Sequence, residues 1–201
     1  MTSARLDPRL GSRLATDFYD RPVLDVARDL IGCELIHDGV GGVIVETEAY
    51  HQSEPAAHSF VGPTPRAEVL FRAPGTTYVY SSYGIHTMLN AVCEAEGVGA
   101  AVLIRAIAPV YGIDRMIERR GRTRINELCS GPGKLGQALG IGLDLNTTSL
   151  IDGPIAIHVP DRVVQHRIST STRIGITKAV ELPWRFFASD DPNVSRGPRA
   201  S

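Results

Sequence analysis

Residues 43–50 have the sequence Val-Ile-Val-Glu-Thr-Glu-Ala-Tyr, and His51 follows directly. The apolar start of this stretch predicts a β-strand. Successive side chains of a strand point to opposite faces, so Glu46, Glu48 and Tyr50 are expected on the same face of a sheet. Two carboxylates and a tyrosine are unusually polar side chains for one face of a half-buried strand, which makes this stretch a candidate functional site.

Further strands are expected on both sides of this stretch. Residues 33–36 lead into an Asp-Gly turn and would pair with the strand as a hairpin. Residues 76–80 and 85–92 flank a turn and predict a second hairpin, and residues 101–107 alternate as a buried strand. Because strands and helices do not alternate regularly, we predict an α+β fold: a single domain with a curved, mainly antiparallel β-sheet core and flanking helices.

The composition is that of a soluble globular protein. The 201 residues, 43% hydrophobic and 21% charged, are enough for one sizeable core. We expect a flexible N-terminal arm over residues 1–15, one domain over residues 16–190 and a flexible tail over residues 191–201. The net charge of −1 gives no electrostatic indication of nucleic-acid binding, but it leaves room for a local basic patch, of which residues 119–124 are the densest candidate.

Several classes of protein are disfavoured. Three cysteines without paired spacing predict neither a disulfide framework nor a zinc site, and the six histidines lack a ligand pattern such as HExxH, so we expect no metal and no cofactor. No apolar run has the length of a membrane span, and the first residues lack a signal-peptide core. We therefore expect a cytoplasmic protein without a membrane partner.

Three other segments have a clear local pattern. Helices are predicted over residues 20–31 and 110–119. A third helix is expected to begin after Ser130-Gly131-Pro132 and to end near residue 140, with Lys134 in its first turn, and its free amide groups would suit a phosphate. Residues 173–176 are predicted as another strand.

The two glutamates suggest one kind of chemistry. Glu46 and Glu48 would lie about 6.6 Å apart along a regular strand. A carboxylate pair at such a spacing suits hydrolysis of a glycosidic bond, in which one group activates water and the other protonates the leaving group. The alternative is a solvated sheet face. Arg105 lies in an apolar run and needs a partner there, because an unpaired buried charge is expensive.

Aromatic side chains are concentrated near these carboxylates. Tyr50, His58, Tyr78 and Tyr80 lie on neighbouring predicted elements, and flat rings can sandwich an unstacked nucleobase. Core or cross-strand aromatic contacts are the alternative. Tyr83 is expected at a hairpin tip, where it could insert into a DNA minor groove, or simply lie on the surface.

These segments together resemble a known family. The sequence is similar to the alkyladenine (3-methyladenine) DNA glycosylases, of the mammalian type and its bacterial relatives, from about residue 17 to residue 190. The matching motifs, in order, are Ile44-Val45-Glu46-Thr47-Glu48-Ala49-Tyr50, Ala56-Ala57-His58-Ser59, Thr64-Pro65-Arg66, Pro74-Gly75-Thr76-Thr77-Tyr78-Val79-Tyr80, Tyr83-Gly84, Asn90, Leu103-Ile104-Arg105-Ala106 and Glu127-Leu128-Cys129-Ser130-Gly131-Pro132.

The resemblance implies a role for individual residues. Glu48 would be the general base that activates a water, with Arg105 and the backbone carbonyl of Ile174 as further contacts of that water. Tyr50 would stack on one face of a flipped base, and His58 and Tyr80 on the other. The remaining implied contacts are exclusion of guanine by Asn90, insertion into the duplex by Tyr83, and DNA-backbone contacts by Lys134, Ser130 and Arg66.

The implied activity is excision of alkylated purines from double-stranded DNA, with deaminated purines as a further implied substrate class. The implied enzyme is a monomeric, monofunctional glycosylase without lyase activity. A target base must leave the stacked duplex before it can react, which explains the need for ring walls and a wedge.

Two alternatives remain open: a catalytically silent module that binds damaged DNA, and a hydrolase of free nucleosides. No residue is a secure acid for neutral bases. The chain also departs from the family in Ile85-His86 and in a shorter segment between His51 and His58.

Overall fold

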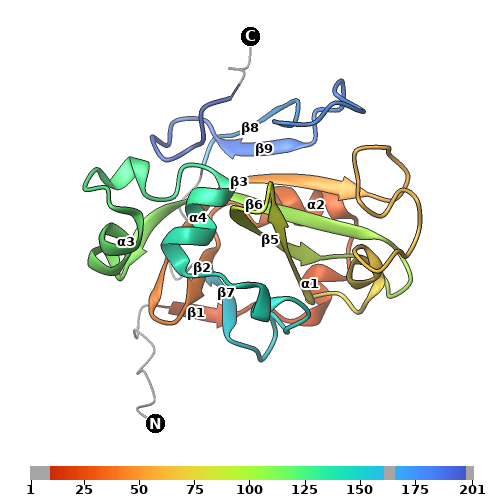
Figure 1. Cartoon of the computed structure of the whole chain (residues 1–201), viewed down its shortest axis with the longest axis horizontal. Coiled ribbons are helices and arrows are strands. Elements are labelled where there is room, and N and C mark those ends of the chain that lie inside the picture. Colours follow the sequence, from red (N-terminus) through yellow and green to blue (C-terminus); the bar gives the residue numbers. More distant parts are fainter. Residues whose placement is uncertain (1–9, 161–165, 198–201) are drawn as a thin grey trace.

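Strand β3 (Val40–His51) contains the opening stretch and runs through the middle of the sheet (Figure 1). The computed structural model describes residues 10–160 and 166–197. One edge of β3 pairs along most of its length with β6 (Ala100–Tyr111). The other edge pairs first with β2 (Glu34–His37) and then, around Glu46 to Glu48, with β9 (Arg185–Ala188). The candidate residues are therefore enclosed by strands on both sides.

The described residues contain nine strands in one sheet, and every strand pair is antiparallel. The prediction of a mainly antiparallel α+β fold is therefore confirmed. The other strands are β1 (Leu10–Arg13), β4 (Thr77–Ser82), β5 (His86–Val92), β7 (Ile155–Pro160) and β8 (Ile168–Ser171). The helices are α1 (Thr16–Tyr19), α2 (Val23–Asp29), α3 (Ile113–Arg120) and α4 (Pro132–Leu139), with short 3₁₀ turns η1 (Glu68–Phe71), η2 (Ile125–Glu127) and η3 (Leu143–Leu145).

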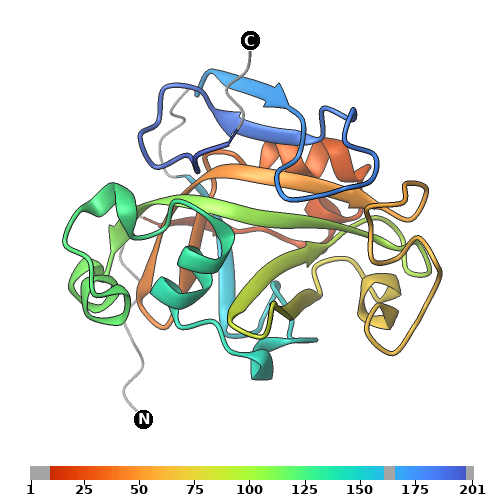
Figure 2. The same ribbon diagram turned by 45° about the horizontal axis from the view of Figure 1, so that its top comes forward.

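Helices lie on both faces of the sheet. Helix α2 covers one face, where the hydroxyl of Thr47 in β3 donates a hydrogen bond of 2.7 Å to the carbonyl of Ala27. Helix α4 lies over β5 and β6 (Figures 1 and 2). Its Gly136 touches β5 so closely that a Cβ there would lie 2.4 Å from the carbonyl oxygen of Thr87. Close packing of α4 brings its N-terminus to the face that also holds Glu48.

The pairing of β3 with β6 is irregular beside the candidate site. The register shifts between Ile44 and Glu46 and again between Glu46 and Thr47. Such irregularities bend a strand and increase its twist, and they often re-aim a side chain. Beyond the shift, Glu48 faces Leu103 and Tyr50 faces Ala101 in regular register.

Three segments differ from the expectation based on sequence. Residues 10–13, assigned to an arm, form β1 and pair with β7. Residues 173–176 form an irregular loop, because Gly175 has a φ of +78° that leaves the strand conformation, and the strand lies earlier at β8. Residues 191–197, assigned to a tail, pack against β3, and Asn193 and Ser195 are both 8% exposed. The remainder of the predicted arm and tail, residues 1–9 and 198–201, lies outside the described residues.

Two of the three predicted helices begin later than expected. Within the predicted span of residues 20–31 the helix is α2, preceded by Pro22 rather than Asp20, and the short α1 lies ahead of that span. The second begins at Ile113, because β6 continues to Tyr111 and Gly112 turns the chain in a left-handed conformation. Over residues 10–160 and 166–197, no helix has the length and apolar character needed to cross a membrane.

Candidate active site

Glu48 is fully buried and surrounded by hydrogen-bond donors. Its Oε1 accepts a hydrogen bond of 2.7 Å from the backbone N–H of Ile174, and its Oε2 accepts one of 2.8 Å from the hydroxyl of Tyr50. Nη1 of Arg105 lies 3.1 Å from Oε2. Burial raises the pKa of Glu48, and the attraction of Arg105 and the two donors offset this only in part. A carboxylate with a raised pKa is suited to accept a proton.

Glu46 has a different environment although it points to the same side. Its Oε1 accepts hydrogen bonds from Nε of Arg105 at 2.7 Å, Nε of Arg185 at 2.8 Å and the hydroxyl of Ser195 at 2.8 Å. Its Oε2 accepts the backbone N–H of Ser195 at 2.7 Å. Burial alone would raise the pKa of Glu46, but the two arginines together hold it below the ordinary value.

These contacts decide between the readings left open for the two glutamates. A solvated sheet face is wrong, because both side chains have no exposed surface. The buried charge of Arg105 is paired with the carboxylates of both Glu46 and Glu48, as its burial requires. Glu46 is saturated with donors and anchors Arg105, so it is not available to protonate a leaving group. Of the two glutamates, only Glu48 has a raised pKa.

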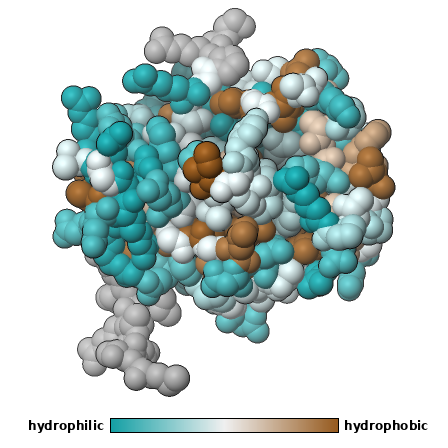
Figure 3. Space-filling model, viewed as in Figure 1, coloured by the Kyte–Doolittle hydropathy of each residue, from teal (hydrophilic) through white to brown (hydrophobic). Residues whose placement is uncertain are grey.

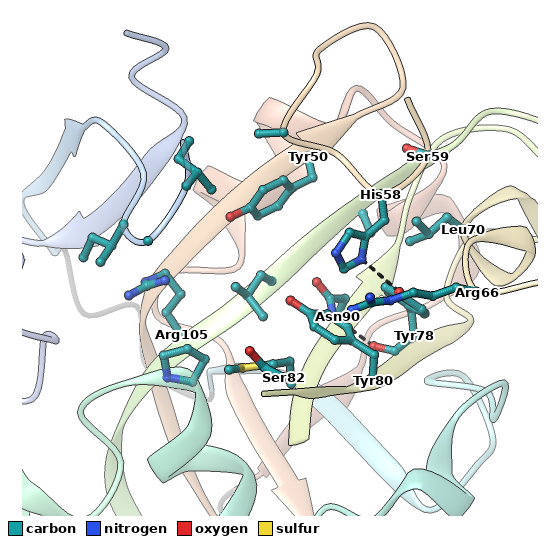
Figure 4. Close-up of a pocket in the computed structure, with 18 of the residues that line it drawn as sticks. Tyr50, His58, Ser59, Arg66, Leu70, Tyr78, Tyr80, Ser82, Asn90 and Arg105 are labelled. Carbon is teal, nitrogen blue, oxygen red and sulfur yellow. Dashed lines mark hydrogen bonds between the residues drawn. The ribbon is translucent and has the colours of Figure 1, made fainter. Parts of the chain in front are cut away.

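Three residues that contact Glu48, namely Tyr50, Arg105 and Ile174, line a cavity of about 690 Å³, and Glu48 itself lies buried behind them. The ring of Tyr50 lies on one side of the cavity, and Tyr80 and His58 lie on the other (Figure 4). Arg105 and Asn90 contribute polar groups to the same lining. The cavity therefore brings together the rings of Tyr50, His58 and Tyr80, and the spacing of its walls could hold a flat heterocycle.

The far wall of the cavity is a packed ring cluster. Tyr78 and Tyr80 are stacked with centroids 5.2 Å apart, and His58 meets Tyr80 edge-on at 4.9 Å. Nδ1 of His58 and the hydroxyl of Tyr78 share a hydrogen bond of 2.9 Å. Burial, and secondarily the charge of Arg66, lower the pKa of His58, so this imidazole is neutral at neutral pH. These residues therefore pack against one another and also line the cavity.

Asn90 is held rigidly in the floor of the cavity. It lies opposite Tyr78 in the pairing of β4 with β5, and its side-chain amide donates a hydrogen bond of 3.0 Å to the Tyr78 carbonyl. It is 5% exposed. A side chain fixed in this way can reject a ligand group by steric conflict.

Tyr83 occupies the tip between β4 and β5, as predicted. Its side chain is 92% exposed, its φ is +52°, and it lines the mouth of the cavity. The neighbouring Ile85 is 79% exposed. An exposed ring on a left-handed backbone has no evident folding benefit.

A second cavity, of about 700 Å³, shares Arg105 with the first. Ser130 and Lys134 lie here at the start of α4, and Nζ of Lys134 donates a hydrogen bond of 3.3 Å to the hydroxyl of Ser130. The other cationic lining residues are Arg120, Arg122, Arg124 and Arg196. The surface over α3 and the following turn is strongly hydrophilic (Figure 3). Arg66 belongs instead to the first cavity, with its guanidinium 5.2 Å from the centroid of Tyr80.

Two groups of site residues escaped the sequence analysis. Ser195 reaches Glu46 across 149 positions, and Arg173 pairs with Glu54 across 119 positions. Neither contact leaves a local pattern. Ile174 was expected to contribute its carbonyl, whereas the contact in the structure is its N–H on Glu48. Among the described residues, no group of three or more His, Cys, Asp or Glu side chains is placed to hold a metal ion.

Comparison with known proteins agrees with this geometry. Residues 17–192 match the family model described as methylpurine-DNA glycosylase. A protein of Bradyrhizobium diazoefficiens is 56% identical over 185 residues, which are 92% of each chain. One of Rhodopseudomonas palustris is 51% identical over 94% of this chain and 91% of its own. One of Methanoculleus marisnigri is 49% identical over 91% of this chain and 98% of its own. All three bear the name "Putative 3-methyladenine DNA glycosylase". With a match over nearly the whole domain, the chain belongs to the methylpurine-DNA glycosylase family.

Proposed function

We propose that the protein is a DNA glycosylase that flips alkylated purines out of double-stranded DNA and hydrolyses their N-glycosidic bond. The observation that carries the proposal is the buried carboxylate of Glu48 in contact with Tyr50, Arg105 and Ile174, which line a cavity with Tyr50 on one side and His58 and Tyr80 on the other. Membership of the family supports the same activity.

The proposed reaction needs one water and one base. Glu48 accepts a proton from a water that attacks the anomeric carbon, and Arg105 helps to hold that water. The bond from the sugar to the purine breaks, and its electron pair goes to the base. A purine methylated on N3 or N7 is cationic and becomes neutral as it leaves, so it needs no further proton. The rings favour that cation through cation–π attraction.

Deaminated purines are a second proposed substrate class. A neutral base such as hypoxanthine leaves as an anion unless it is protonated, and Glu46 is unsuited to that role because it is ion-paired with Arg105 and Arg185. We therefore propose that neutral lesions react more slowly than cationic ones. A panel of duplexes that each contain one lesion measures the order.

The DNA contacts follow from exposure and charge. Tyr83 fills the gap left by the flipped nucleotide, and Lys134 and Ser130 contact the DNA backbone beside the second cavity. Arg66 reaches the nucleotide at the cavity mouth. We further propose a monomer that acts in the cytoplasm, since its proposed substrate is the cell's genomic DNA.

We also propose that the enzyme has no lyase activity. A lyase needs an amine that attacks the sugar, whereas the proposed water-activating group, buried behind the cavity wall, is the carboxylate of Glu48. Lys178 is an amine in the cavity lining, so the question is open to a direct test. Borohydride treatment during turnover should trap no covalent protein–DNA adduct, and a trapped adduct would contradict this part of the proposal.

The central experiment uses Glu48→Gln. Gln has almost the size of Glu but cannot accept the proton, and general-base catalysis contributes about 10²- to 10⁴-fold. We expect that loss in the single-turnover rate of base release from a duplex with a methylated purine or ethenoadenine, with binding retained. If the wild type releases no base from any lesion, the proposed function is wrong. Full activity of Glu48→Gln would remove Glu48 from the mechanism instead.

The same assays of base release separate the two alternative functions. A silent damage-binding module would release no base with either protein. A nucleoside hydrolase would release base from the free nucleoside as fast as from the duplex.

A further inference from the structure

A buried ion pair lies behind the Tyr50 wall of the cavity. The side chain of Arg173 has no exposed surface, and that of Glu54 is 5% exposed. Nη1 of Arg173 donates to Oε1 of Glu54 at 2.6 Å and Nη2 donates to Oε2 at 2.9 Å. Nη1 also donates to the carbonyl of Ala49 in β3 at 3.0 Å. This two-pronged contact ties the loop after β3 to the loop before β9.

The same guanidinium supports the ring of Tyr50. Its central carbon lies 4.6 Å from the centroid of Tyr50 and 5.3 Å from that of Trp184. The hydroxyl end of Tyr50 is already fixed by its hydrogen bond to Glu48. With Arg173 against the ring itself, Tyr50 is restrained at two places.

Both partners continue into other parts of the active site. The residue after Arg173 is Ile174, whose N–H donates to Glu48. Oε2 of Glu54 also accepts the backbone N–H of Ala56 at 2.8 Å, two residues before His58. The ion pair therefore connects the base, one ring wall and the loop that carries part of the opposite wall.

We propose that Arg173 and Glu54 are positioning residues that set the spacing between the Tyr50 and His58 walls and hold the Ile174 amide on Glu48. The inference rests on the proposed function. Neither residue lines the cavity, and each would act through the residues it holds: Tyr50, Ile174 and the loop that carries His58. A fixed slot keeps the reacting atoms in near-attack geometry, and small displacements far from the chemistry can cost on the order of 10²-fold in rate.

A merely structural role makes a different prediction. Breaking a buried ion pair destabilises a protein whatever the pair does for the active site. A positioning role also predicts a change at Glu48 itself. The N–H of Ile174 lowers the pKa of Glu48, so its displacement should raise that pKa further and shift the acid limb of the rate profile to higher pH.

The test compares Arg173→Lys and Glu54→Gln with a stability control. Lys keeps the charge but cannot donate to both carboxylate oxygens, and Gln keeps the size but loses the charge. The control is Val26→Ala, a fully buried core change in α2, on the other face of the sheet. For each variant we would measure Tm, the single-turnover rate at saturating enzyme, the half-saturating enzyme concentration and the pH profile, on a duplex with a cationic methylated purine.

We expect the two clamp variants, Arg173→Lys and Glu54→Gln, to lose at least about tenfold in the rate at saturating enzyme, compared with a control whose Tm is lowered by the same amount. The acid limb of their pH profiles should lie at higher pH than that of the control. Emission from Trp184, the single tryptophan, should change in Arg173→Lys but not in Val26→Ala. If the clamp variants match the control in rate and pH profile, the pair is only structural and the inference is wrong. If one clamp variant does not fold, the other gives the same comparison. An inactive wild type would overturn the proposed function and this inference with it.

Discussion

At the scale of single residues, the two carboxylates of β3 differ because their neighbours differ. Glu46 has two arginines and both polar groups of Ser195 around it, and its pKa is lowered. Glu48 contacts one arginine, which also contacts Glu46, and accepts hydrogen bonds from two neutral donors. Burial raises the pKa of Glu48. Pairs of like groups whose environments separate their pKa values commonly divide acid–base roles. Here the lowered pKa keeps Glu46 an anion at neutral pH, where it pairs with Arg105, and the raised pKa of Glu48 brings its titration closer to neutral pH.

The pH dependence of the rate follows from Glu48. The proposed base acts as the carboxylate, which is present above its pKa and lost as the pH falls through it. Since that pKa is raised above the ordinary 4.5, the rate should decline at a higher pH than an ordinary glutamate allows, by about tenfold per pH unit on the acid side. Single-turnover rates on an alkylated purine, measured with circular dichroism at each pH to show that the fold persists, check this. A rate that stays flat to below pH 4.5 would exclude Glu48 as the titrating group.

Asn90 gives a prediction about specificity. If it rejects guanine by crowding the exocyclic amine, a smaller side chain should relax that rejection. We expect Asn90→Ser to release normal guanine at a measurable rate, while losing no more than about tenfold on alkylated adenine, since the discrimination from one small group is worth about 1–3 kcal/mol. Release of each base from matched duplexes measures the ratio. Thr87→Ser, on the same strand, is the control, and an unchanged guanine rate in Asn90→Ser contradicts the assignment.

At the residue scale, the sequence predicted those positions that depend on local alternation. The two-residue period placed Glu46, Glu48 and Tyr50 on one side of β3, and the cost of an unpaired charge required a partner for Arg105. The roles assigned to the site residues stay predictions. The donors on Glu46 and Glu48 from Ser195 and Ile174 were not predictable, because the chain returns from more than 100 positions away and leaves no periodic signal.

At the scale of elements, the β4–β5 hairpin joins two tasks. Its strands contribute Tyr78, Tyr80 and Asn90 to the cavity, and its tip presents Tyr83 to solvent. A hairpin that is rigid at its base and exposed at its tip can distort a duplex while it holds the extruded base in register with the cavity.

Tyr83→Gly tests the tip. Glycine accepts the φ of +52° without strain, so we expect the fold to be retained and Tm to be unchanged or slightly higher. Loss of the wedge should lower excision from a fully paired duplex by about tenfold or more, because unstacking then lacks compensation, and should affect a single-stranded substrate much less. Val61→Ser, which changes another exposed apolar residue, is the control. Equal losses on both substrates would mean that Tyr83 does not act as a wedge.

The elements themselves were predictable where the pattern was strong. The hairpins around β3 and between β4 and β5 agree with their Gly-containing turns and alternating strands. Residues 173–176 looked like a strand because they are apolar at alternate positions, but Gly175 turns the chain there. Residues 10–13 lack a strong strand pattern, and they form β1 only because β7 offers an unpaired edge.

At the scale of the whole molecule, charge is distributed unevenly. The net charge of −1 conceals a group of cations around the second cavity, which shares Arg105 with the first. A sum over the chain cannot show such a patch, since folding brings residues 120–134 and 192–196 together. Composition was therefore uninformative about a DNA partner, whereas the arrangement of the cations is compatible with one.

The C-terminal segment gives the prediction at this scale. Deletion of residues 193–201 removes Ser195 and leaves Glu46 without two of its four hydrogen bonds. Because unsatisfied buried acceptors cost about 1–3 kcal/mol each, we expect a lower Tm and a reduced rate. Deletion of residues 198–201 keeps these bonds and is the control. Thermal unfolding and single-turnover assays of both proteins decide the point, and equal behaviour of the two deletions would show that Ser195 is dispensable.

The bond between Ser195 and Glu46 also has a consequence for synthesis on the ribosome. Glu46 is made 149 positions before Ser195, so β3 can pair with β2 and β6 before Glu46 receives its two hydrogen bonds from Ser195. The sheet can therefore assemble first, and the surroundings of Arg105 are completed only once the chain has been extended past Ser195. The order of synthesis thus separates folding of the scaffold from completion of the proposed active site.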